Sequence, residues 1–82
     1  MTVLQRMPED KEILDMIRAG VNTAPDIAHK IYGYPESWEW QLAKNRVVHR
    51  LHNLKRFNII RQTGRWSELG NGVKAKIWEV VE

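Results

Sequence analysis

The chain has 82 residues, of which 43% are hydrophobic and 28% charged, with four tryptophans and no cysteine. This length allows one small domain over residues 1–82, and the lack of cysteine excludes disulfides and thiolate metal sites, so apolar packing must hold the fold. No apolar run has the length of a membrane span and no signal peptide opens the chain, which predicts a soluble, cytoplasmic protein.

The net charge of +3 conceals an asymmetry along the chain. Residues 1–42 contain four Lys or Arg against seven Asp or Glu, whereas residues 43–82 contain nine against three. Charge separated in this way is typical of a protein whose basic surface faces a polyanion, although an ordinary solvated surface gives the same pattern. Charge alone leaves both interpretations open.

The first half of the chain predicts two short helices. Pro8 signals the start of one helix, with Glu9, Asp10 and Glu12 placed where the helix dipole favours acids, and Gly20 is expected to end it. Thr23-Ala24-Pro25-Asp26 resembles a capping box at the start of the second, which Gly33 ends. The side chains expected to face the core, at helical spacing, are Ile13, Leu14, Ile17, Val21, Ile27, Ala28 and Ile31.

A long third helix is predicted after a turn at Tyr34-Pro35-Glu36, with Ser37 as its N-cap. Asn58 is expected to end it in the left-handed conformation, which asparagine tolerates better than most residues. Trp38 is expected to point away from the core. The apolar face comprises Trp40, Ala43, Val47, Leu51 and Leu54; the polar face comprises Gln41, Asn45, His49, His52, Asn53 and Arg56, with Arg46 and Arg50 along one flank.

Beyond Asn58 the spacing of apolar residues changes from about 3.6 to about 2, which indicates β-structure. Residues 59–64 and 73–81 are rich in β-branched side chains and predict two strands. Residues 67–72 are the expected turn, because Asn71-Gly72 is a strong tight-turn motif. Trp66 and Trp78 are expected to cover the inner face of this hairpin or to mark a dimer contact. The predicted class is therefore α+β.

Three segments carry a family resemblance. They are the capped helix start from Asn22 to Ile31, the apolar side chains of the third helix, and Asn58-Ile59-Ile60-Arg61. With this order of elements, the chain resembles a winged helix-turn-helix domain of prokaryotic or archaeal transcription regulators, a three-helix bundle followed by a β-hairpin wing. Two departures are a longer segment between Gly33 and Val47, and Arg46 where the family commonly has Ser or Thr.

The resemblance implies sequence-specific binding of double-stranded DNA by a transcriptional regulator, with the third helix in the major groove and the wing on the backbone or minor groove. A homodimer remains open, and no cofactor or small-molecule effector is expected. Residues expected to contact bases are Gln41, Asn45, Arg46, His49 and Arg50. Residues expected to contact the DNA backbone are Thr23, Lys44, Asn53, Lys55, Arg56, Arg65 and Lys74.

Other functions fit the sequence less well. Winged-helix domains also act as protein–protein interaction modules in larger assemblies, which suits Trp38 and the acidic first half. Structured RNA is a further alternative partner, although no RNA-stacking motif supports it. His49 and His52 lack a third metal ligand nearby, and no nucleophile, phosphate loop or His–carboxylate arrangement predicts catalysis, so neither a metal site nor an enzyme is expected.

Overall fold

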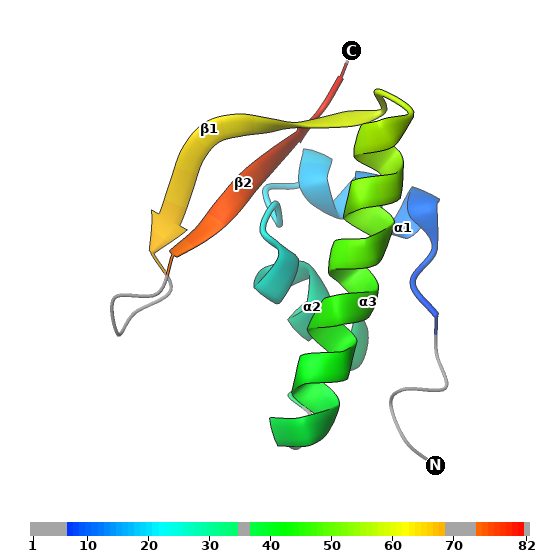
Figure 1. The fold of residues 1–82 in the computed structure, drawn as a ribbon, viewed down its shortest axis with the longest axis vertical. Coiled ribbons are helices and arrows are strands. Elements are labelled where there is room, and N and C mark those ends of the chain that lie inside the picture. The colour runs from blue at the N-terminus through cyan, green and yellow to red at the C-terminus, as the bar shows by residue number, and fades with distance from the viewer. Residues whose placement is uncertain (1–6, 35–36, 69–73, 82) are drawn as a thin grey trace.

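Three helices precede a two-stranded antiparallel hairpin, whose far end leans away from the helices (Figure 1). The computed structural model describes residues 7–34, 37–68 and 74–81. The predicted order of elements is confirmed. Within the described segments, no helix is long and apolar enough to cross a membrane. The elements are α1 (Asp10–Arg18), α2 (Ala24–Tyr32), α3 (Ser37–Arg56), β1 (Ile60–Glu68) and β2 (Lys74–Val80).

Both ends of α1 agree with the prediction from the sequence. The helix begins two residues after Pro8, with Asp10 and Glu12 in its first turn, and the Pro8 side chain is fully buried, so it also contributes packing. Gly20, at φ 96°, donates its N–H to the carbonyl of Ile17 at 3.1 Å, and Val21 donates to Met16 at 2.9 Å. These two bonds form a Schellman motif, which confirms Gly20 as the stop.

Side-chain capping and a glycine set the limits of α2. The Thr23 Oγ1 accepts a hydrogen bond from the backbone N–H of Asp26 at 3.4 Å, which is the N-cap bond of the predicted capping box. At the other end Gly33, at φ 72°, donates its N–H to the carbonyl of His29 at 2.8 Å. Both predicted boundaries of α2 are confirmed.

The long segment before Val47 is taken up as additional turns of α3, which begins at Ser37 and has 20 residues. Ser37 is thus the first helical residue and not the N-cap, while Pro35 and Glu36 of the predicted turn lie outside the described residues. An aromatic stack fastens this end of α3 to α2. The His29 ring lies 4.0 Å from the Trp40 ring and 4.2 Å from the Tyr34 ring, centroid to centroid.

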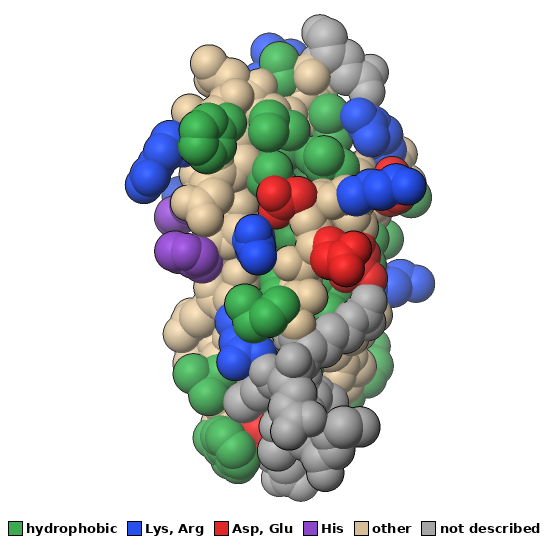
Figure 2. Space-filling view, turned by 90° about the vertical axis from the view of Figure 1, so that its right-hand side faces the viewer, with side chains coloured by type: hydrophobic (Ala, Val, Ile, Leu, Met, Phe, Trp, Pro, Cys, Tyr) green, Lys and Arg blue, Asp and Glu red, His purple; other side chains and the backbone are tan. Residues whose placement is uncertain are grey.

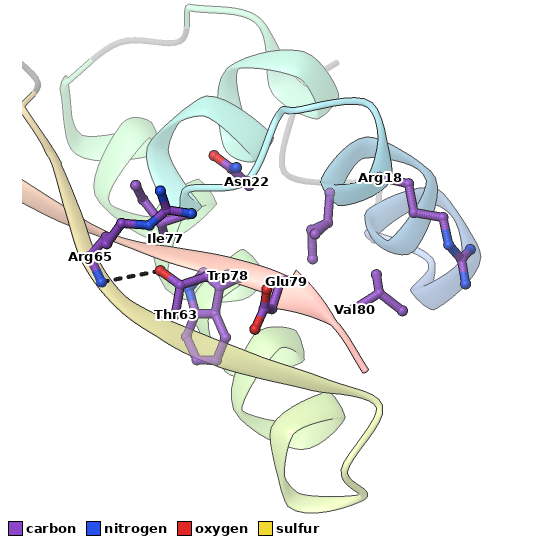
Figure 3. A pocket seen from close by; sticks show the side chains of 9 residues that line it. Arg18, Asn22, Thr63, Arg65, Ile77, Trp78, Glu79 and Val80 are labelled. Carbon is purple, nitrogen blue, oxygen red and sulfur yellow. Dashed lines mark hydrogen bonds between the residues drawn. The ribbon is translucent and has the colours of Figure 1, made fainter. Parts of the chain in front are cut away.

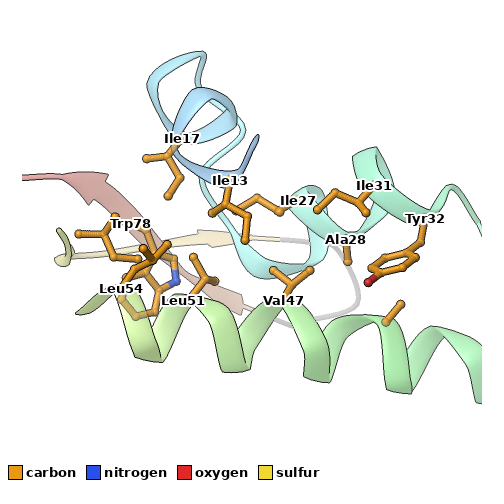
Figure 4. Close-up of a cluster of buried hydrophobic side chains, with 12 residues drawn as sticks. Ile13, Ile17, Ile27, Ala28, Ile31, Tyr32, Val47, Leu51, Leu54 and Trp78 are labelled. Carbon is orange, nitrogen blue, oxygen red and sulfur yellow. The ribbon is translucent and has the colours of Figure 1, made fainter. Parts of the chain in front are cut away.

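The hydrophobic core lies where α1, α2 and the base of the hairpin cover one face of α3 (Figure 4). Leu14, Val21 and Trp40 were expected in this core and are partly buried at its edge. Every other predicted core residue of the three helices is buried, because the helical spacing directs these side chains to one side of each helix. The buried set is Ile13, Ile17, Ile27, Ala28, Ile31, Tyr32, Ala43, Val47, Leu51, Leu54, Ile60 and Trp78.

The junction from α3 to the hairpin is a second Schellman motif. Asn58, at φ 60°, donates its N–H to the carbonyl of Lys55, and Ile59 donates to Leu54, both at 3.0 Å. The left-handed conformation predicted for Asn58 is confirmed. It turns the chain directly from the last turn of α3 into β1.

The predicted end of the first strand is wrong. β1 continues past Gly64 to Glu68, so the residues at 67 and 68 belong to the strand and not to the turn. Gln62 pairs with Trp78 and Trp66 pairs with Lys76, so residues 63–65 form a bulge opposite a single residue of β2. Gly64, at φ 85°, supplies the positive φ that this bulge needs and does not end the strand. The predicted Asn71-Gly72 turn lies outside the described residues.

The base of the hairpin is joined to the helices. The backbone N–H of Trp78 donates to the carbonyl of Asn22 at 2.9 Å, which ties β2 to the connection between α1 and α2. β2 also packs against α1, and β1 against α3. The Trp78 side chain is only 4% exposed, which confirms that it covers the inner face of the hairpin.

Candidate nucleic-acid interface

The exposed side of α3 carries a ridge of polar side chains. Gln41, Asn45 and His49 succeed one another at intervals of four residues and are exposed, and His52 and Arg56 continue the ridge toward the end of the helix. The Gln41 Nε2 donates to the Asn45 Oδ1 at 3.3 Å. Three of the five predicted base-contacting residues therefore share one accessible surface, which we call the α3 ridge.

The two arginines predicted to contact bases lie elsewhere. Arg46 and Arg50 are half-buried and one turn apart, and the Arg50 Nη1 is 3.5 Å from the Asp10 Oδ1 of α1. This ion pair directs Arg50 toward α1 and away from the α3 ridge. Asn53, one turn beyond Arg50, is also half-buried. The face that includes α1 mixes acidic with basic side chains and shows histidines only along its edge (Figure 2).

The predicted phosphate contacts on the helices are dispersed. The Lys44 Nζ lies 5.5 Å from the centroid of the Trp40 ring, on the side of α3 that stacks against α2. Lys55 and Arg56 are exposed in the last turn of α3. Thr23 is 1% exposed and its hydroxyl caps α2, whereas Ala24 and Pro25 are half-buried and Asp26 is exposed, so a ligand at this helix start would meet the first turn rather than the Thr23 side chain.

A groove of about 290 Å³ separates α3 from the hairpin. His52 and Val48 line it from α3, and Trp66, Lys74, Lys76 and Trp78 line it from the hairpin. The Lys76 Nζ lies 5.9 Å from the centroid of the Trp66 ring, and the His52 ring centroid lies 6.3 Å from that of Trp78. We call this the hairpin groove, and it places Lys74 beside the helix that bears the α3 ridge.

Lys76 was not predicted as a site residue, although the sequence contains the necessary pattern. Lys74, Lys76 and Trp78 alternate along β2 and therefore project from the same face of the strand. Because the Trp78 side chain is buried against the helices, Lys74 and Lys76 project from the face of β2 that is turned toward the helices. Trp66, which pairs with Lys76, was predicted from the sequence only to cover the inner face of the hairpin or to mark a dimer contact. In the structure its side chain is 55% exposed beside the hairpin groove.

Arg65 projects to a different side of the hairpin from Lys74. It lines an open cavity of about 520 Å³ together with Arg18 and Asn22, and its guanidinium reaches toward Asn22 (Figure 3). Its backbone N–H donates to the Thr63 Oγ1 at 3.1 Å within the bulge. Because the bulge interrupts the alternation of side chains along β1, the spacing alone did not give the direction of Arg65.

Among the described residues, no three His, Asp or Glu side chains are grouped as ligands for a metal ion. Comparisons with protein-family models, with curated proteins and with solved structures find no match for this chain.

Proposed function

We propose that this protein is a winged-helix domain that binds double-stranded DNA in a sequence-specific manner, as a transcriptional regulator. The observation that supports it best is the placement of the α3 ridge next to the hairpin groove, whose rim carries Lys74 and Lys76. Three helices followed by an antiparallel hairpin provide the scaffold. In this proposal the hairpin is the wing.

The chemistry of the ridge suits the major groove, which is wide enough to admit a helix. Asn45 and Gln41 carry amides, which pair with the exposed edge of adenine, and His49 supplies a further donor or acceptor. Lys44, Lys55, Lys74 and Lys76 would then contact phosphates, which gives affinity without sequence information. Arg50 is given no base contact in this proposal because its guanidinium points toward Asp10 of α1 and not along the α3 ridge.

Salt-dependent binding tests this proposal. We expect the full chain to retard a mixed-sequence duplex in a gel at low salt. If about six phosphates are neutralised, affinity should fall by about 1,000-fold between 50 and 200 mM salt, because each contact releases condensed counterions. A Lys74→Ala variant should show a shallower dependence on salt concentration. No binding to any duplex at low salt would exclude the proposal.

A protein–protein interaction module is the second candidate. Trp38 and Tyr34 are 61% and 87% exposed near the start of α3, and Leu42, four residues beyond Trp38, is also exposed. Apolar side chains gathered in this way are typical of contact sites. A partner that remains bound after nuclease treatment, that duplex DNA does not displace and that Trp38→Ala releases would favour this function over DNA binding.

A further inference from the structure

Trp66 differs from the other tryptophan of the hairpin. Trp78 is buried against the helices, whereas Trp66 is 55% exposed at the wall of the hairpin groove. The Lys76 ammonium stands over the Trp66 ring at 5.9 Å from its centroid, within the range of a cation–π contact. An exposed indole with a cation beside it is a surface on which a planar, negatively charged group can stack.

The size of the hairpin groove limits what it holds. A volume of about 290 Å³ is at the lower end of the range for small-ligand pockets, so it suits one planar ring system and not a helix or a duplex. Val48 and Trp78 supply apolar surface, and His52 supplies ring nitrogens. Lys74 stands opposite Glu68 in the hairpin, whereas Lys76 stands opposite Trp66 and not opposite an acid.

These properties match a single nucleotide, with a flat base for the apolar surface and a phosphate for the lysine. In a fully paired duplex the flat faces of the bases are covered by their neighbours, and only the base edges are presented in the grooves. An aromatic side chain can stack on a base only where that base is unpaired, terminal or turned out of the duplex.

We infer that the hairpin groove receives one unpaired nucleobase, stacked on Trp66 with its phosphate at Lys76, so that the protein prefers a duplex containing an unpaired base. This inference rests on the proposed function. It adds to sequence recognition a preference for duplexes with an unpaired base. The α3 ridge contacts the paired region, and the hairpin groove binds the base that is no longer stacked in the duplex.

Two labelled duplexes of the same sequence test the inference, one fully paired and one with a single unpaired adenine. The full chain should bind the second about tenfold more tightly, since stacking of one base on an aromatic side chain has an effect of this order. Trp66→Ala should abolish the difference while leaving binding to the paired duplex unchanged. Trp66→Phe, which keeps an aromatic ring, should retain part of it.

Trp38→Ala is the matched control, because Trp38 is equally exposed but lies at the far end of α3. It should keep the full preference, and circular dichroism should show that both alanine variants are folded. Equal binding of the two duplexes by the wild type, or a preference that survives Trp66→Ala, would overturn the inference and leave the proposed function standing. No binding to either duplex would overturn both. If Trp66→Ala weakened binding of a polyglutamate peptide and not of DNA, the groove would be a peptide site instead.

Discussion

If α3 binds DNA as proposed, its polar side chains differ in how freely they can reach a base. Asn45 is exposed between Gln41 and His49, whereas Arg50 is half-buried and paired with Asp10. The exposed amide of Asn45 can present its donor and acceptor to a base edge. The one hydrogen bond it would give up among the described residues is the surface bond from Gln41. For Arg50, contact with a base would first require the ion pair with α1 to break.

Substitution of Asn45 should therefore affect specificity more than substitution of Arg50. We expect Asn45→Ala to relax the preference at one base position by about 1–3 kcal/mol, the value of a good side-chain–base pair. Lys74→Ala should weaken binding to all sequences alike, because a phosphate contact carries no sequence information. Competition between single-base variants of a selected site measures both effects.

Arg50→Ala provides the control for this series. It removes a large basic side chain from the same helix, and it should leave the ranking of sequences as in the wild type. Should Arg50→Ala relax the preference more than Asn45→Ala does, the assignment of base contacts to the α3 ridge would be incorrect.

At the scale of the elements, the exit from α3 fixes the direction of the hairpin. Asn58 adopts φ 60° between the last turn of the helix and β1. This conformation costs an L-residue roughly 1–2 kcal/mol, less for asparagine, and costs glycine nothing. The structure therefore retains some strain at a position where the backbone hydrogen bonds of the Schellman motif are already formed.

Asn58→Gly should raise the free energy of unfolding by up to about 1 kcal/mol because it removes this strain. Asn58→Val should lower it by about 1–2 kcal/mol, since a β-branched side chain tolerates positive φ poorly. Urea unfolding followed by circular dichroism measures both. Asn53→Gly, the same substitution inside α3, should instead destabilise by about 0.3 kcal/mol, the difference in helix propensity between the two residues. If Asn58→Gly and Asn53→Gly changed the free energy of unfolding in the same direction, Asn58 would not be strained.

The limits of the elements were predictable where local rules decide them. Gly20, Thr23, Gly33 and Asn58 each set a helix boundary through hydrogen bonds to residues within five positions, so their sequence neighbourhood was sufficient. The end of β1 was not predictable in this way. Gly64 has the same residue type and the same sign of φ as the helix-ending glycines, and only pairing with β2 makes it a bulge.

Trp78 joins the two parts of the whole molecule. It is buried at 4% exposure in the core formed with the helices, and its backbone N–H is bonded to Asn22. A domain of this size has a total stability of about 4–12 kcal/mol, at roughly 0.05–0.15 kcal/mol per residue. The burial of one large core side chain therefore contributes a considerable share of the total stability.

Trp78→Ala should lower the free energy of unfolding by about 3–5 kcal/mol because it leaves a large cavity between hairpin and helices. Trp66→Ala, the same substitution two residues from the outer end of the hairpin's pairing, should change it by less than about 0.5 kcal/mol because Trp66 is exposed. Urea unfolding of both variants gives the comparison. Equal losses would show that Trp66 is part of the core in solution.

The candidate site was less predictable than the fold, because it depends on which elements meet. The sequence indicated that Arg50 lies on a flank of the third helix. It did not indicate that α1 would bring Asp10 to that flank. It placed Lys74 in the hairpin, but the side of Arg65 depends on a bulge that sequence periodicity did not indicate. Lys76 was missed but could have been predicted, since its alternation with Trp78 along β2 places the two side chains on the same face of the strand.

The bulge at residues 63–65 divides the hairpin into two segments of different local stability. The segment next to α3 contains Ile60 and Trp78 and is part of the core, whereas the outer segment, from Trp66 to Glu68 and its partners on β2, contributes no residue to the buried set. Backbone amides of the outer segment should therefore exchange with solvent through local opening, and those of the inner segment only on global unfolding. Local opening of the outer segment would thus leave the helical core folded.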